Sequence, residues 1–78
     1  MALGVGIKRS VTIAGHETSI SLEPLFWAGL DAAADDEGLP LNALVARIDV
    51  ARLDVLPPPN LTSEIRQWLL LRAVRGDR

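Results

Sequence analysis

Cysteine is absent from this chain of 78 residues, which excludes a disulfide framework and thiolate chemistry. Aromatic residues are scarce and comprise only Phe26, Trp27 and Trp68. No group of metal-binding residues surrounds the single histidine, His16, so neither a metal site nor another cofactor is expected. A chain this short often needs a disulfide, a metal or a partner chain to complete its core. With the first two excluded, self-association is expected.

Long apolar runs are also missing. No segment approaches the ~18 apolar residues of a membrane span. The apolar N-terminal residues precede Lys8 and Arg9, whereas in a signal peptide the charges come first. The sequence therefore predicts a cytoplasmic protein that does not associate with membranes.

The charge is slightly negative, at −2, but its distribution is uneven. Acidic residues gather in residues 31–37, and basic residues lie near the two ends, in residues 8–9 and 66–78. Such a separation is compatible with one positive face on a dimer. No nucleophile and base stand in a pattern that supports catalysis, so an enzyme is not expected.

A half-buried strand is predicted from the alternation in residues 17–22. Thr18, Ile20 and Leu22 would face the core, and the polar face would consist of Glu17, Ser19 and Ser21.

The preceding segment is ambiguous. Val11 and Ile13 alternate in the same way, but Ala14, Gly15 and His16 interrupt the pattern. Gly15 suits either a two-residue hairpin turn or a kink before the main strand. We favour a kinked or mobile arm, and expect His16 to be exposed to solvent.

Three helices follow the strand. The first is predicted to begin at Pro24, which suits the first helical position, and to end at Gly38 in a left-handed cap. The second opens at residues 40–42 and runs to about Leu53 or Val55. Residues 57–59, three prolines, form a stiff spacer, and a third helix begins between residues 60 and 63.

One strand without a partner in its own chain needs another copy to satisfy its main-chain hydrogen bonds. The expected fold is therefore mainly α with one β-strand, and two chains intertwine through an antiparallel two-stranded ribbon. The expected parts are a flexible arm in residues 1–10, a core in 11–56, a proline-rich spacer in 57–60 and an extra C-terminal helix in 61–75. The predicted dimer core comprises Thr18, Ile20, Leu22, Phe26, Leu30, Leu44, Val45 and Ile48.

The segments TSISLEPLFW, from Thr18 to Trp27, and GLPLNALV, from Gly38 to Val45, resemble the ribbon–helix–helix repressor family. The resemblance is closer to small bacterial proteins described only as ribbon–helix–helix domain proteins, and it covers roughly Lys8 to Leu70.

The resemblance implies a homodimer whose ribbon enters the DNA major groove. By this resemblance, base edges would be read by Glu17, Ser19 and Ser21, and phosphates would be held by Lys8, Arg9, Leu41 and Asn42. A sequence-specific DNA-binding homodimer that acts as a transcriptional regulator is the first interpretation.

A protein-interaction module of the antitoxin kind is the alternative. The net negative charge, Glu17 on the ribbon face and Pro40 at the start of the second helix all favour it. The partner would dock on the ribbon edge or on the third helix near Trp68. Closing the core is the more ordinary role for Trp68, as it is for Phe26 and Trp27.

Overall fold

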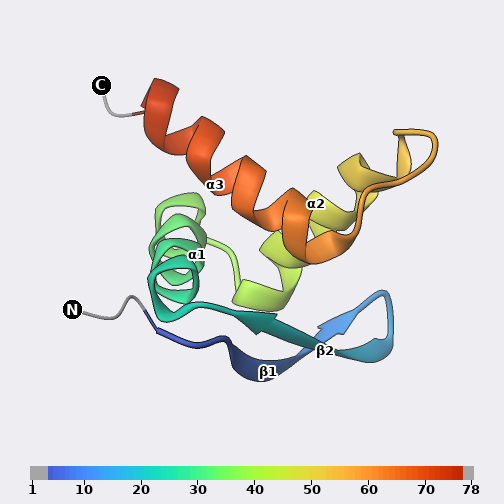
Figure 1. Cartoon of the computed structure of the whole chain (residues 1–78), viewed down its shortest axis with the longest axis horizontal. Helices are drawn as coiled ribbons and strands as arrows, with labels where there is room; N and C mark the ends of the chain where they lie inside the picture. The colour runs from blue at the N-terminus through green and yellow to red at the C-terminus, as the bar shows by residue number, and fades with distance from the viewer. Residues whose placement is uncertain (1–3, 77–78) are drawn as a thin grey trace.

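A β-hairpin opens the computed structural model, which describes residues 4–76 (Figure 1). Strand β1 (Ile7–Ile13) pairs antiparallel with β2 (His16–Leu22), in a register that sets Ile7 opposite Leu22 and Ile13 opposite His16. Ala14 and Gly15 make the turn, with φ of 51° and 82°. Two successive positive φ values are typical of the type I′ turn, whose twist matches that of the flanking strands.

The expectation of a single strand after a kinked or mobile arm is therefore wrong. Gly15 adopts a positive φ without steric cost and Ala14 accepts one, so the chain reverses within two residues. Residues 7–10, expected in the N-terminal arm, belong to β1, while residues 1–3 of that arm lie outside the described residues. Because β1 pairs with β2 within one chain, the strand does not depend on a second copy for a partner.

The first two helices begin and end close to the residues that the sequence marks as helix ends. Helix α1 (Pro24–Glu37) has Pro24 in its first turn and ends at Gly38, whose φ of 67° is left-handed. The amide of Leu39 donates to the carbonyl of Ala34 at 2.9 Å, which completes the expected cap. Helix α2 (Leu41–Leu53) follows directly, with Pro40 at its N-cap.

Helix α3 (Leu61–Gly76) follows a loop over residues 54–60 that contains the three prolines. Asn60 caps the helix, because its side-chain Oδ1 accepts a hydrogen bond from the amide of Ser63 at 2.7 Å. The loop is held to α2 by Arg52, whose Nη1 donates to the carbonyl of Pro59 at 3.1 Å.

The core lies between the inner face of the hairpin and the three helices, which are stacked on one side of the sheet (Figure 1). Both strands and all three helices contribute side chains to it, and α3 contributes the fully buried Ile65. The buried residues are Val11, Ile13, Ile20, Leu22, Trp27, Leu30, Ala33, Ala34, Leu44, Val45, Ile48 and Ile65. Within residues 4–76, no helix has the length and apolarity that crossing a bilayer requires.

The residues predicted to form a dimer core therefore pack within one chain. Six of the eight are buried in this core: Ile20, Leu22, Leu30, Leu44, Val45 and Ile48. Phe26 and Thr18 are only half-buried. The sequence pattern therefore identified six of the twelve residues that are buried within residues 4–76, and one copy of the chain supplies all twelve.

Candidate nucleic-acid interface

The outer face of the hairpin carries only polar side chains in its three central pairs. Because neighbouring residues in a strand point to opposite faces, the register sets Lys8 beside Ser21, Ser10 beside Ser19, and Thr12 beside Glu17. All six residues are exposed. We call this set the outer ribbon face.

Three of the six were predicted as base contacts, and they lie on the exposed face of the strand as expected. Glu17, Ser19 and Ser21 share the exposed face of β2, opposite the buried Ile20 and Leu22. Their neighbours on β1, Ser10 and Thr12, were missed because β1 itself was not recognised as a strand. The alternation of Ser10 and Thr12 with Val11 and Ile13 was the signal that identifies them.

Lys8 and Arg9, predicted together as phosphate contacts, point in opposite directions. Lys8 is on the outer ribbon face and is exposed. Arg9 turns to the inner face, where its guanidinium carbon lies 4.3 Å from the centroid of the Trp27 ring and its Nη1 lies 3.5 Å from Asp31. Trp27 also donates from Nε1 to the carbonyl of Ile7 at 2.7 Å. Arg9 and Trp27 therefore attach β1 to α1.

The start of α2 was the other predicted phosphate site. Leu41 is half-buried and packs against the core, and Asn42 is exposed. Pro40 has no amide hydrogen, and its carbonyl accepts from the amides of Ala43 and Leu44. The amides of Leu41 and Asn42 have no acceptor within residues 4–76. Such amides are the donors with which helix N-termini hold anions.

Most of the arginines are neutralised by carboxylates of the same chain. Arg9 pairs with Asp31, Arg47 with Glu37, Arg52 with Asp49, Arg66 with Glu23, and Arg72 with both Asp36 and Glu37. Lys8, by contrast, has no ion-pair partner among the residues that the structure describes. The outer ribbon face therefore has one uncompensated cation, Lys8, which lies at the opposite end of the face from the carboxylate of Glu17.

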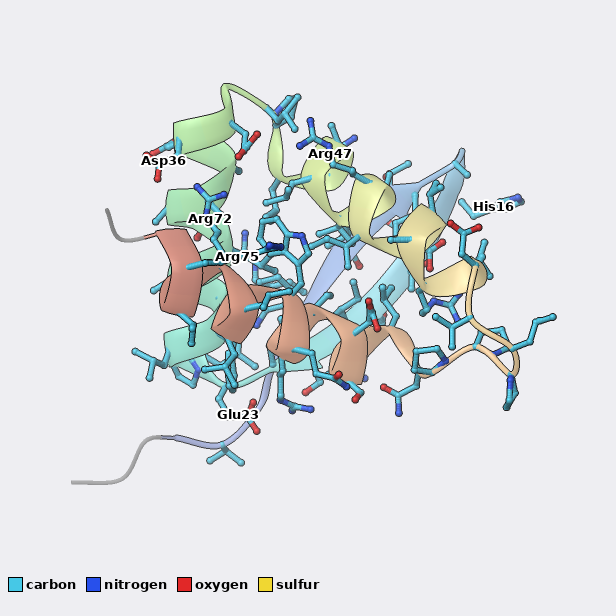
Figure 2. The ribbon with its side chains drawn as sticks, turned by 90° about the horizontal axis from the view of Figure 1, so that it is seen from above. His16, Glu23, Asp36, Arg47, Arg72 and Arg75 are labelled. Carbon is cyan, nitrogen blue, oxygen red and sulfur yellow. The ribbon has the colours of Figure 1, made fainter. Side chains whose placement is uncertain are left out.

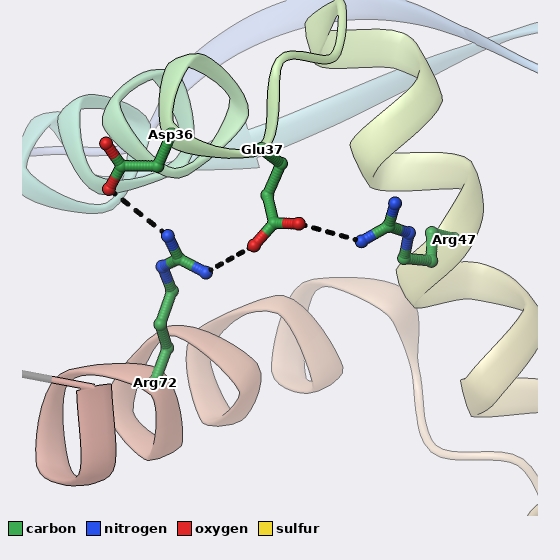
Figure 3. A network of polar contacts seen from close by, with 4 residues as sticks. All are labelled: Asp36, Glu37, Arg47 and Arg72. Carbon is green, nitrogen blue, oxygen red and sulfur yellow. Dashed lines mark hydrogen bonds and ion pairs between the residues drawn. The ribbon is translucent and has the colours of Figure 1, made fainter.

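Figure 3 shows the largest ion-pair network, which connects all three helices. Arg72 of α3 contacts Glu37 at 3.0 Å and Asp36 at 3.2 Å, and Arg47 of α2 contacts the second oxygen of Glu37 at 3.3 Å. A hydrogen bond from Arg72 is the main cause that lowers the pKa of the Glu37 carboxyl, and a hydrogen bond from Arg47 is the next. The hydrogen bond to Glu37 in turn raises the pKa of Arg72. The network fixes the end of α1 against α2 and α3.

A second ion pair fixes the other end of α1. Arg66 donates from Nε and Nη2 to the carboxylate of Glu23, with distances of 3.0 to 3.2 Å. The pKa of Glu23 is lowered, first by a hydrogen bond to its own backbone and then by Arg66. These charges therefore stabilise helix packing and are engaged away from the outer ribbon face.

His16 and Trp68 were the remaining candidates. His16 follows the turn, is exposed, and points away from the body of the molecule (Figure 2). The described part of the chain contains no group of three residues able to hold a metal ion. Trp68 is half-buried against the core, with the guanidinium carbon of Arg72 5.5 Å from its ring centroid. Its position fits closure of the core rather than presentation to a partner.

Comparison with known proteins yields one match. No curated protein and no solved structure matches the chain. A family model described as a ribbon–helix–helix domain matches residues 6–73. The match includes β1 and most of α3, so the third helix lies largely inside the matched domain and is not simply an addition to it. The chain belongs to the ribbon–helix–helix domain family.

Proposed function

We propose that the protein binds double-stranded DNA, as a transcriptional regulator of the repressor kind, by placing its outer ribbon face in the major groove. The observation that carries this proposal is the polar face that the two strands form together. Strands lie about 4.8 Å apart, and the major groove, about 12 Å wide, admits a two-stranded ribbon. The ribbon–helix–helix family includes DNA-binding regulators and antitoxins.

Five of the six residues of the face have a role suited to their chemistry. The hydroxyls of Ser10, Ser19 and Ser21 donate to or accept from base edges, and Glu17 accepts from the exocyclic amine of cytosine. Lys8 neutralises a phosphate beside the groove. The free amides of Leu41 and Asn42 hold a second phosphate at the start of α2. Arg9 is omitted, because its guanidinium is stacked on Trp27.

The protein is further proposed to act as a homodimer, the usual state in ribbon–helix–helix families. Two copies would present two hairpins to DNA, and the symmetry of the dimer would then appear as symmetry in the recognised sequence.

Binding to genomic fragments, measured by fluorescence anisotropy at several salt concentrations, tests the DNA-binding proposal. The double variant Ser19→Ala, Ser21→Ala should lose sequence preference while it keeps its fold. Lys8→Ala should lower the slope of log affinity against log salt by about one, because one fewer counterion is released. Arg9→Ala is the matched control: it should lower stability and leave the slope unchanged. A folded protein that binds no fragment at low salt contradicts the proposal.

A protein-interaction module of the antitoxin kind is the second candidate. The pairing of arginines with carboxylates favours it, because it leaves the chain little positive charge to offer DNA. A Glu17→Arg variant separates the two candidates. A large gain in DNA affinity from a negligible starting value would show that the native face is not built for DNA. A native affinity that already depends steeply on salt would favour DNA binding.

A further inference from the structure

The outer ribbon face carries a different charge at each of its two ends. Lys8 lies in one end pair and Glu17 in the other, and neither has an ion-pair partner within residues 4–76. The end pairs are four residues apart along each strand, which corresponds to about 14 Å at about 3.4 Å per residue. This separation exceeds the Debye length of about 8 Å at physiological salt, so the two charges do not neutralise each other.

These two charges break a symmetry that the hydroxyls of the face obey. A twofold axis normal to the sheet, passing between the strands at the middle pair, would exchange Ser10 with Ser19, Thr12 with Ser21, and Lys8 with Glu17. The first two exchanges replace one hydroxyl by another, whereas the third replaces an ammonium by a carboxylate. Lys8 and Glu17 therefore give the face a direction.

Hydrogen-bonding capacity follows the same direction. The hydroxyls in the middle of the face both donate and accept, whereas an ammonium only donates and a carboxylate only accepts. In the major groove, the carboxylate of Glu17 suits the exocyclic amine of cytosine. The ammonium of Lys8 suits a phosphate or the acceptor atoms of guanine. The two ends of the hairpin therefore prefer different partners.

A ribbon shared between two copies would have no such direction. Two β2 strands related by a twofold axis would carry Glu17 at both ends, and both ends would select the same base. In this chain β1 supplies the second strand, so one copy presents a complete ribbon with two unlike ends. The three helices lie on the other side of the sheet and leave this face uncovered (Figure 1).

We propose that one chain is a complete DNA-reading unit and that the short sequence under its hairpin is directional. A cytosine is selected at the end under Glu17 and not at the end under Lys8. The element spans at most about four base-pair steps, because about 14 Å of ribbon lies along a duplex that rises about 3.4 Å per step. This inference rests on the proposed DNA binding, but not on whether two copies associate.

Selection from duplexes with a randomised core of about six base pairs tests the direction, because such a core holds a single ribbon. The flanks should be inverted complements of each other, so that they impose no direction. The selected core should differ from its own inverted complement. A core with the cytosine at one end should bind within about twofold of a core with it at both ends, whereas a shared ribbon would lose about tenfold. A stoichiometric titration should give one chain per duplex.

Glu17→Lys should remove the direction, because it places an ammonium at both ends of the face. The selected core should then become its own inverted complement, and the preference for cytosine should be lost. Asp35→Lys is the matched control: Asp35 is an exposed residue of α1 without an ion pair in the described part of the chain, and its substitution makes the same change in charge. It should raise affinity for every duplex and keep the direction. Circular dichroism checks that both variants retain the fold.

The outcomes separate this inference from DNA binding itself. A wild-type core that is its own inverted complement, or two chains bound to each single-element duplex, overturns the one-chain reading and keeps DNA binding. A Glu17→Lys variant that selects the same directional core as the wild type also overturns the inference, as does binding without any enrichment. A folded protein that binds no duplex at low salt overturns the proposed function together with it.

Discussion

The hairpin turn offers the most direct test of the fold. Ala14 has a φ of 51°, a left-handed conformation that costs an L-residue with a Cβ about 1 to 2 kcal/mol. Asparagine is tolerated there, and Asn-Gly is the preferred pair in type I′ turns. Ala14→Asn should therefore stabilise the protein by about 1 kcal/mol. For 78 residues the entropy of unfolding is about 0.16 kcal/mol/K, so Tm should rise by about 6 °C.

The matched control is the neighbouring glycine. Gly15 has a φ of 82°, and an added Cβ would meet no atom within 4 Å. Gly15→Ala should therefore lower stability through backbone strain alone, by about 1 kcal/mol. Thermal unfolding at one fixed protein concentration measures both variants, since self-association would make Tm depend on concentration. If neither substitution moves Tm, the chain does not turn at these residues and the assignment of β1 to a hairpin fails.

Three further predictions concern the helices. Ile65→Ala should cost about 2 to 5 kcal/mol in chemical denaturation, because the side chain is fully buried, whereas Val74→Ala should change stability by less than about 0.5 kcal/mol. Asn60→Ala removes the cap of α3 and should cost about 1 kcal/mol; no change would mean that the cap is not used. The pKa of Glu37 is lowered in the folded state, so its stabilising effect is complete above its ordinary pKa and is lost as the pH falls through the folded value. Glu37→Gln should reduce the acid dependence of stability, and an unchanged profile would contradict the network.

The helices were predictable because their ends are marked by residues with strong local preferences. Pro24 fits only the first turn of a helix, and Gly38 fits a left-handed cap, so both ends of α1 followed from the sequence. Half of the buried core residues followed from periodicity in the same way, among them Leu30, Leu44 and Ile48. What periodicity does not specify is whether a core residue packs within one chain or across two.

The hairpin was missed because Ala-Gly is a weak turn signal. Asn-Gly or Asp-Gly between two alternating segments would have indicated a type I′ turn. Alanine rarely adopts the left-handed conformation that Ala14 has here, so its presence did not indicate a turn. The opposite orientations of Lys8 and Arg9 were not predicted for the same reason. Adjacent residues point to opposite faces in a strand, and β1 had not been recognised as one. Recognising β1 would have placed Ser10 and Thr12 in the candidate interface as well.

The pairing of β1 with β2 also changes what self-association has to accomplish. A ribbon shared between two chains couples folding to dimerisation, because an isolated strand leaves its main-chain groups unpaired. In this chain the hairpin and a core of buried residues from every element are complete in one copy. In the homodimer that we propose, association would then not need strand pairing between the two copies. Such a dimer would dissociate to folded monomers on dilution, whereas an intertwined dimer would unfold as it separates.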